Sequence, residues 1–339
     1  MKAAVLHGKE DIRIEEVMEK PLKQGELRLA IQAALTCGTD LKVYKRGYHA
    51  RMLVPPTVFG HELAGIISET GVGTDHWSVG ERVVVANSAP CGHCFYCLTA
   101  QENLCDDLLF LNGAYAESIV IPSRMVEKNL YRIKSSTEFS SAALTEPLAC
   151  VVQGLADLAP KSGERALVIG SGPIGLMFVS LLTSMGCKVA VLGRGAERLQ
   201  TASELGAESI TELRNDSSVE SLQTGLGRLD LVIEAVGKPE TWELALTLVR
   251  KGGKVNFFGG CPAGTQVNFD ATRIHYSNIH MMASFHHTPS TFRSALGHIE
   301  DGSVPAAKFI TQQRKLDELP FLFEEMAKGS RAVKTLIVP

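Results

Sequence analysis

Residues 166–175 read Ala-Leu-Val-Ile-Gly-Ser-Gly-Pro-Ile-Gly. The first four are a short apolar run, which predicts a buried β-strand. The rest match a glycine pattern in which the backbone approaches a pyrophosphate and a helix N-terminus supplies partial positive charge. A helix that ends near Gly186 and a strand from Lys188 are expected to follow. Because the loop lies between a strand and a helix, it predicts a dinucleotide site rather than a glycine-rich turn. Its candidate cofactor-binding residues are Gly170, Gly172, Pro173, Ile174 and Gly175.

The end of the next strand bears on which dinucleotide is bound. It reads Val191-Leu-Gly193-Arg194-Gly195, whereas an NAD site usually has Asp or Glu here to hold the ribose hydroxyls. Without the acid there is no repulsion against a 2′-phosphate, and a guanidinium can pair with one in a bidentate fork. Arg194 and nearby Arg198 therefore favour NADP over NAD. If Arg194 is instead a solvated loop residue that stacks on adenine, either cofactor is permitted.

The segment around this loop alternates between strand-like and helical runs. Apolar runs recur at 166–169, 189–192, 229–233 and 254–258, and helical stretches such as 196–205 and 240–250 separate them. This alternation predicts an α/β fold with a parallel sheet built from βαβ units. Residues 166–187 carry no charge and are long enough to span a bilayer, but their glycines and Pro173 favour a buried strand followed by a buried helix.

The first 145 residues have a different texture. Alternating runs at 11–17, 26–31, 80–85 and 115–121 predict short, half-buried strands, as does the final run at 333–338. The sequence therefore predicts an irregular β-rich region before the α/β region.

Four of the eight cysteines lie within fifteen residues of this β-rich region, at Cys91, Cys94, Cys97 and Cys105. Four thiolates on a tight loop supply the tetrahedron that Zn²⁺ prefers. Because they fill all four positions, they predict a closed, structural zinc site. A disulfide pair is the less favoured alternative, since the first twenty residues lack the apolar core of a secretion signal.

Composition narrows the class of protein. The 339 residues favour two or more domains, and 45% hydrophobic content supports large cores. The formal net charge of −3 gives no basic excess for nucleic acid. With thiols kept reduced, we expect a cytosolic protein that binds neither nucleic acid nor membrane.

A second group of metal-binding side chains lies upstream. Cys37-Gly-Thr39-Asp40 closes a predicted strand, and Gly60-His61-Glu62 begins another. A thiolate, an imidazole and a carboxylate are the ligands of an open zinc site that keeps one position for substrate. Asp40 is expected to accept a hydrogen bond from the other ring N–H of His61. Taken singly, Cys37 and His61 are more typical of buried core residues than of ligands, and their weight comes from occurring with the dinucleotide loop and the four cysteines.

Together these features resemble the zinc-dependent medium-chain dehydrogenases/reductases, the superfamily of alcohol, sorbitol and threonine dehydrogenases. The resemblance covers essentially the whole chain. The residues that carry it, in family order, are Cys37–Asp40, Gly60–Glu62, the four-cysteine stretch, Gly113-Ala-Tyr-Ala-Glu117, Glu146-Pro147 and Gly170–Gly175.

The resemblance implies a domain organisation. It predicts a GroES-like catalytic domain over residues 1–145 with a structural zinc lobe at about 88–110, a Rossmann NAD(P)-binding domain over 146–283, and a return to the catalytic domain over 284–339. It also implies dimers or tetramers.

The resemblance assigns roles as well. Cys37 and His61 would bind a catalytic zinc, with Glu62 or Glu146 as the carboxylate ligand. In members similar to sorbitol dehydrogenase both acids stand near the metal, and which one coordinates varies with state. Thr39 would take the substrate's hydroxyl proton. Lys42 replaces the histidine that passes this proton to solvent in many relatives, and its role stays open, as does that of the pair His286–His287.

The implied reaction is NAD(P)-linked hydride transfer from a secondary alcohol of a polyol, sugar or cyclitol, with zinc polarising the substrate oxygen. An L-threonine 3-dehydrogenase is the alternative within this class. A partner-binding protein with a zinc lobe and a relic fold is the alternative outside it, and it would be expected to lose at least one of Cys37, Thr39, His61 and Glu62.

Overall fold

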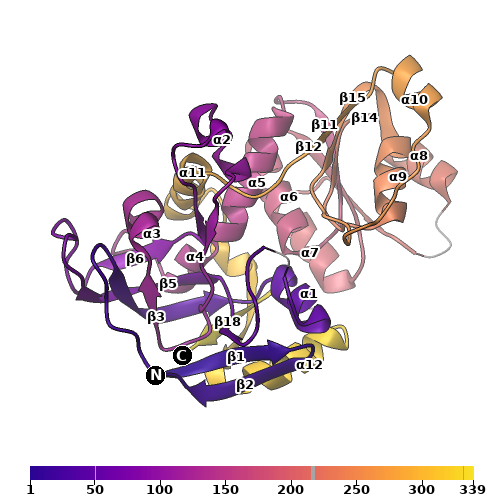
Figure 1. Ribbon diagram of the computed structural model, residues 1–339. Helices are drawn as coiled ribbons and strands as arrows, with labels where there is room; N and C mark the ends of the chain where they lie inside the picture. Colours follow the sequence, from indigo (N-terminus) through magenta and orange to yellow (C-terminus); the bar gives the residue numbers. More distant parts are fainter. Residues whose placement is uncertain (50, 215–217, 331) are drawn as a thin grey trace. The chain divides into compact units, whose positions relative to one another are not determined.

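Two sheets of different character organise the chain, one in each of two units. The computed structural model describes residues 1–49, 51–214, 218–330 and 332–339. Unit 1 comprises Met1–Ala149 and His287–Pro339, and unit 2 comprises Cys150–His286. Unit 1 thus holds both ends of the chain, and Figure 1 shows its yellow C-terminal segment among the indigo N-terminal strands.

The main sheet of unit 1 is mostly antiparallel, in the order β10-β6-β5-β3-β18-β17, and β9 also pairs with β3. A smaller sheet has the order β2-β1-β4. The strands are β1 (Lys2–Gly8), β2 (Asp11–Glu16), β3 (Leu27–Leu35), β4 (Thr57–Val58), β5 (Glu62–Thr70), β6 (Arg82–Val85), β9 (Ser118–Ile121), β10 (Leu130–Arg132), β17 (Ile310–Lys315) and β18 (Lys334–Val338). A separate pair, β7 (Ser88–Ala89) and β8 (Leu109–Phe110), flanks the four-cysteine stretch.

The helices of unit 1 are short, and α1 directly follows strand β3. They are α1 (Gly38–Arg46), α2 (Phe95–Leu98), α3 (Ser123–Lys128), α4 (Phe139–Ala143), α11 (Pro289–Glu300) and α12 (Leu319–Ala327). Helix α5 (Thr145–Leu158) begins in unit 1 and continues into unit 2.

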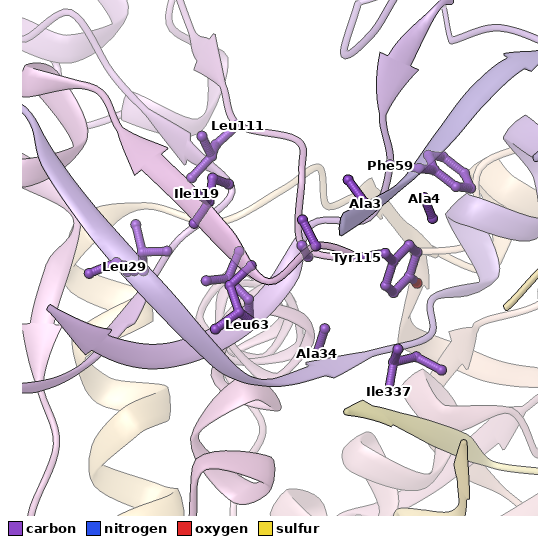
Figure 2. Close-up of a cluster of buried hydrophobic side chains, with 14 of the residues drawn as sticks. Ala3, Ala4, Leu29, Ala34, Phe59, Leu63, Leu111, Tyr115, Ile119 and Ile337 are labelled. Carbon is purple, nitrogen blue, oxygen red and sulfur yellow. The ribbon is translucent and has the colours of Figure 1, made fainter. Parts of the chain in front are cut away.

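A core of aromatic and aliphatic side chains joins the two sheets of unit 1. Phe59 and Tyr115 pack edge to face with ring centroids 5.9 Å apart, and both are fully buried. Figure 2 shows them near Ala3 and Ala4, and it shows Ile337 of the C-terminal strand beside Ala34, near the C-terminal end of β3. The last strand of the chain is therefore part of the N-terminal core.

The register at the end of β3 decides which segments meet there. Leu35 pairs with Glu62 of β5 on one side and with Leu336 of β18 on the other. Residues that follow β3, begin β5 and begin β18 are therefore neighbours, although they are up to about 300 positions apart in sequence.

Unit 2 contains a six-stranded parallel sheet in the order β13-β12-β11-β14-β15-β16. Its strands are β11 (Arg165–Ile169), β12 (Lys188–Gly193), β13 (Ser209–Glu212), β14 (Leu229–Glu234), β15 (Val249–Phe257) and β16 (His280–Ala283). Its own helices are α6 (Pro173–Ser184), α7 (Ala196–Glu204), α8 (Val219–Leu226), α9 (Pro239–Leu248) and α10 (Ala271–Tyr276). Figure 1 shows α6 and α7 on one side of the sheet and α8 and α9 on the other. This doubly wound arrangement confirms the predicted α/β fold with a parallel sheet.

Two local expectations change, and a third is confirmed. The helix expected over 240–250 ends at Leu248, where Val249 takes an extended conformation and begins β15. The strand expected over 115–121 begins only at Ser118, because Tyr115 bonds through its backbone to Phe59 and Ala4 instead of β3. The strand and helix predicted within the uncharged stretch 166–187 are present as β11 and α6. No described helix has the length and apolarity needed to cross a bilayer.

Candidate functional site

Cys37, His61 and Glu62 come together at the end of β3. Their ligand atoms all lie within 4.8 Å of one another, although 24 residues separate the cysteine from the histidine. Cys37 caps the N-terminus of α1, and its sulfur accepts a hydrogen bond from the Thr39 amide at 3.4 Å. The positive end of the helix therefore faces the sulfur. His61 and Glu62 are buried.

A buried chain of contacts holds His61 from behind. Its Nδ1 lies 2.9 Å from Asp40 Oδ1, a close charge contact whose angle is not that of an aligned hydrogen bond. The Tyr115 hydroxyl lies 2.6 Å from the other carboxylate oxygen of Asp40 and donates to it. With Nδ1 against Asp40, Nε2 is the ring nitrogen that would bind a metal, because a carboxylate behind a histidine ligand orients its ring in this way. The sequence predicts this pairing of Asp40 with His61, but as a hydrogen bond, whereas the structure has a close charge contact.

Glu62 is held by a buried lysine from the end of the chain. Lys334 Nζ lies 2.7 Å and 2.6 Å from the two carboxylate oxygens of Glu62, and both side chains are inaccessible to solvent. Burial raises the pKa of Glu62, and the Lys334 charge opposes that rise. Burial would lower the pKa of Lys334, but the Glu62 and Cys37 charges outweigh it and raise that pKa.

Glu146 is a second buried carboxylate near the Cys37–His61–Glu62 cluster. It sits in the first turn of α5, is 5% exposed, and its carboxylate is 3.9 Å from His287 Nε2. That imidazole nitrogen also lies 3.0 Å from Asn87 Oδ1. Burial lowers the pKa of His287 to about 3, so the ring is neutral near pH 7. Burial raises the pKa of Glu146 to about 7, with His61 and Glu62 acting in opposite directions on it.

The charge balance of this cluster favours a metal cation. Three carboxylates, those of Asp40, Glu62 and Glu146, are buried beside a single buried lysine. Burial lowers the pKa of His61, but Asp40 and Cys37 raise it further, and the result lies well above its ordinary value. The cluster therefore draws positive charge to His61, either a proton or a metal. A sulfur, an imidazole nitrogen and a carboxylate in reach of one another are a donor set suited to Zn²⁺.

The four cysteines of the lobe form a second, closed donor set. The sulfur of Cys94 lies 3.5 Å from that of Cys97 and 3.9 Å from that of Cys105, and Cys91 and Cys97 are 3.9 Å apart. Zn–S bonds of about 2.3 Å in a tetrahedron place sulfurs about 3.8 Å apart, whereas a disulfide needs about 2 Å. The eight cysteines, all within the described residues, are not joined in disulfides.

Backbone amides support the lobe's thiolates. Gly92 N–H donates to Cys97, Cys94 N–H donates to Cys91, and Cys91 N–H donates to Cys105, at 3.2–3.3 Å. Amide donors, that of Cys97 first, lower the pKa of Cys94 to about 6. This lobe is therefore prepared for a structural zinc.

In unit 2 the glycine loop follows β11 and opens α6. Gly170 has a φ of +120°, and Gly172 caps the helix, with Pro173 in its first turn. A Cβ on Gly175 would lie 1.8 Å from the Gly170 carbonyl oxygen, so only glycine permits this turn to pack against the helix. Ile174 lies in the same first turn, half-buried. The loop thus has the geometry that binds a pyrophosphate at a helix N-terminus.

The end of β12 has no room for an acidic side chain. A Cβ on Gly193 would lie 2.5 Å from Ser171 Oγ, which itself bonds to both the N–H and the carbonyl of Arg194, at 3.1 Å and 2.8 Å. The Arg194 side chain is exposed, with Nε donating to the Leu213 carbonyl at 3.2 Å. Arg198 is half-buried in the first turn of α7.

The sequence does not predict the contacts of four side chains of unit 1. Lys334 was included only in an expected strand, although a lysine in an otherwise apolar run is a signal of a buried partner. Tyr115 belongs to the Gly113–Glu117 motif, but no pattern in the sequence predicts its contact with Asp40. Neither Asn87 nor a buried role for His287 has a sequence signal. Lys42 is exposed on α1 and Cys150 is half-buried on α5.

Comparisons with known proteins cover both units. Residues 23–130 match the model of the alcohol dehydrogenase GroES-like domain, and residues 173–301 match that of the zinc-binding dehydrogenases. Sorbitol dehydrogenase from Bacillus subtilis is 28% identical over 349 residues, which cover 100% of this chain and 97% of that protein. L-threonine 3-dehydrogenase from the same organism is 29% identical over 337 residues, covering 96% and 94%.

Solved structures agree with this assignment. A zinc-binding dehydrogenase from Sinorhizobium meliloti 1021, solved with NADP bound, has a TM-score of 0.91 at 27% identity and covers 100% of this chain and 99% of its own. The alcohol dehydrogenase from Thermus sp. ATN1 has a TM-score of 0.89 at 27% identity, with the same coverage. Since both domain models, the full-length relatives and the two donor sets agree, this chain belongs to the zinc-dependent medium-chain dehydrogenases/reductases and is an oxidoreductase of the alcohol and polyol type.

Proposed function

We propose that this enzyme transfers a hydride between a secondary alcohol of a polyol, sugar or cyclitol and a nicotinamide dinucleotide. The observation that carries the proposal is the buried Cys37–His61–Glu62 cluster, whose excess negative charge calls for a metal. Zinc bound there supplies Lewis-acid polarisation of a substrate oxygen, and the dinucleotide supplies the redox chemistry.

The residues of the chain have separate tasks in this proposal. Cys37, His61 and one of Glu62 and Glu146 hold the metal. Asp40 fixes the ring of His61, and Tyr115 fixes Asp40.

The proton of the substrate hydroxyl passes to Thr39 Oγ1. Thr39 is half-buried, two residues after Cys37, and Lys42 is exposed three residues further along α1. Residues three apart on a helix share a face, so Lys42 marks a route from this hydroxyl to solvent.

For the cofactor we infer a preference for NADP. Gly193 leaves no acidic group to bind ribose hydroxyls or repel a 2′-phosphate, and the exposed Arg194 offers a guanidinium beside it. The Sinorhizobium relative with bound NADP supports this choice. Arg194→Ala should raise the KM for NADP⁺ by about tenfold or more and that for NAD⁺ little, since a charged pairing is typically worth that much. Lys188→Ala, at the other end of β12, is the matched control, and an equal effect of Arg194→Ala on both cofactors would contradict the inference.

L-threonine 3-dehydrogenase activity is the second candidate, because relatives with that name are as similar to this chain as the sorbitol dehydrogenases. Pocket contacts that distinguish such substrates are each worth only about 1–3 kcal/mol, which family membership does not resolve.

The test is a hydride-transfer screen of zinc-loaded protein with NAD⁺ and NADP⁺ against polyols, sugars, cyclitols and threonine. Activity on one polyol or cyclitol would support the proposal, and activity on threonine alone would establish the second candidate. Two zinc ions per chain are expected. One zinc ion and no turnover would contradict the catalytic site. The same preparation should be analysed by light scattering, for which we propose a homo-oligomer.

A further inference from the structure

The imidazole ring of His49 is held in one orientation by its own backbone turn. Its Nδ1 accepts hydrogen bonds from the Arg51 N–H at 3.2 Å and from the Met52 N–H at 3.0 Å. A neutral imidazole has one donor and one acceptor nitrogen, so these two amides leave the proton on Nε2. Burial lowers the pKa of His49, and the charges of His61, Arg46 and Arg51 lower it further. The ring is therefore a neutral donor near pH 7.

The Nε2–H of His49 has no acceptor among the residues that the structure describes, although the ring is half-buried. Polar groups that are withdrawn from bulk water are as a rule hydrogen-bonded. An oxygen atom from outside the protein must therefore accept this hydrogen bond, either from a water molecule or from a ligand.

The turn that carries His49 is anchored within unit 1. His49 and Leu53 form an isolated antiparallel bridge, and Leu53 is buried in the same core as Phe59. The Met52 carbonyl accepts a hydrogen bond from Asn112 Nδ2 at 2.9 Å. The turn is thus fixed at both the backbone and the core.

These anchors lead back to the metal donors at the end of β3. Asn112 precedes Gly113, whose N–H donates to the Gly60 carbonyl at 2.8 Å. His61 follows Gly60 directly, so a short series of bonds joins the His49 turn to this metal donor. The charge of His61 acts on His49, as expected for two rings in the same neighbourhood.

A fixed neutral donor close to the metal donors suits a substrate oxygen other than the one that reacts. In a polyol, sugar or cyclitol, the carbon next to the reacting carbinol carries a hydroxyl group, whose oxygen has lone pairs to accept a hydrogen bond. In a simple secondary alcohol that carbon has only carbon and hydrogen substituents. Because the donor is neutral, it does not repel a metal ion nearby.

We propose that His49 is a specificity-determining residue whose Nε2–H donates to the hydroxyl next to the reacting carbinol, so that the site prefers vicinal diols to simple secondary alcohols. This inference rests on the proposed function and names the part of the substrate that the chain recognises. It assigns the recognition to the turn between α1 and β4.

The test compares two substrates that differ by one hydroxyl group, 2,3-butanediol and 2-butanol, with zinc-loaded full-length protein. In His49→Asn the side-chain oxygen still accepts from the N–H groups two and three residues on, as Nδ1 does, but the shorter side chain does not reach the position of Nε2. The kcat/KM for the diol should fall by about fivefold or more, and that for 2-butanol by less than about twofold, since one hydrogen bond is worth about this much.

Two further variants separate recognition from support of the turn. His49→Gln places an amide N–H near the position of Nε2 and should keep most of the preference for the diol. His76→Asn is the matched control, because His76 is an exposed histidine of the same unit, and it should change neither rate. If His49→Asn matches the parent on both substrates, or slows both equally, the inference is overturned.

The parent protein supplies the remaining outcomes. If a longer polyol is the better substrate in the screen, that polyol and its analogue without the adjacent hydroxyl replace the butanol pair. A parent that oxidises the mono-alcohol as well as the diol, or threonine and no polyol, also overturns the inference. A parent that oxidises no alcohol at all contradicts the proposed function itself, which is a distinct result.

Discussion

The two metal-binding regions of unit 1 differ in how the chain assembles them. The four-cysteine lobe draws all its ligands from residues 91–105, and its thiols already stand at the spacing of a zinc tetrahedron. The Cys37–His61–Glu62 cluster draws on segments that follow β3, begin β5 and begin β18, and it contains competing carboxylates and a buried lysine. One loop can supply all the ligands of a structural site, whereas a site that must also position substrate depends on the sheet around it.

The largest effect should come from a substitution in the Cys37–His61–Glu62 cluster. Cys37→Ser should reduce turnover to background, because a metal ligand is lost where the substrate oxygen is polarised. The melting temperature should stay close to that of the parent, since the lobe is untouched. Steady-state kinetics and metal analysis check this, with one zinc ion per chain expected. Cys261→Ser is the control. Full activity in Cys37→Ser would show that Cys37 is not a ligand of a catalytic zinc.

A cysteine substitution in the four-cysteine lobe should lower the melting temperature first. Cys97→Ser removes a ligand of a site whose metal stabilises the fold, and we expect the melting temperature to fall by on the order of 5–10 °C. Calorimetry checks this, with Cys187→Ser as the control because Cys187 is a buried thiol in unit 2. A variant that melts and assembles like the parent would show that the lobe has no structural role.

The two metal-binding regions should also respond differently to a change of pH. In protein freed of its catalytic metal, Glu146 has a pKa of about 7 compared with an ordinary 4.5. Because the folded state holds this proton more tightly, the resulting stability is present below about pH 4.5 and is lost as the pH rises through 7, on the order of 3 kcal/mol in all. The lobe's zinc, by contrast, binds better as pH rises, because its ligands must be deprotonated.

Melting temperatures between pH 5 and 8 check the Glu146 effect. The metal-free parent should lose stability across this range, and Glu146→Gln should flatten the slope. An equal slope in both proteins would show that another group is responsible.

The smallest effect concerns the support behind His61. Tyr115→Phe removes only the hydroxyl that donates to Asp40, and zinc affinity at the open cluster should fall by about tenfold, without effect on the lobe. Tyr44→Phe is a matched control, because both tyrosines are buried against Phe323. If the two variants bind zinc equally well, the chain from Tyr115 through Asp40 does not support the metal site.

Much of the fold was readable because its signals are local. The alternation of apolar runs and helices predicts the parallel sheet of unit 2, and the glycines at 170, 172 and 175 place its loop, since backbone φ and close packing admit no side chain there. Strand limits at Tyr115 and Val249 were less predictable, because they depend on which partner strand takes the backbone hydrogen bonds.

By itself, the sequence determined the four-cysteine set and the dinucleotide loop, because each rests on residue types at short spacing. It pointed to Cys37, His61 and Glu62 only because they occur in one chain with those two motifs. Only the tertiary structure decided what surrounds them. Lys334 reaches Glu62 from 272 residues away, Ser171 fills the space where an acid at Gly193 would stand, and His287 lies against Asn87 and Glu146. These contacts depend on strand register and burial, which together set the energies of the charged groups. Neither register nor burial is encoded in a local sequence pattern.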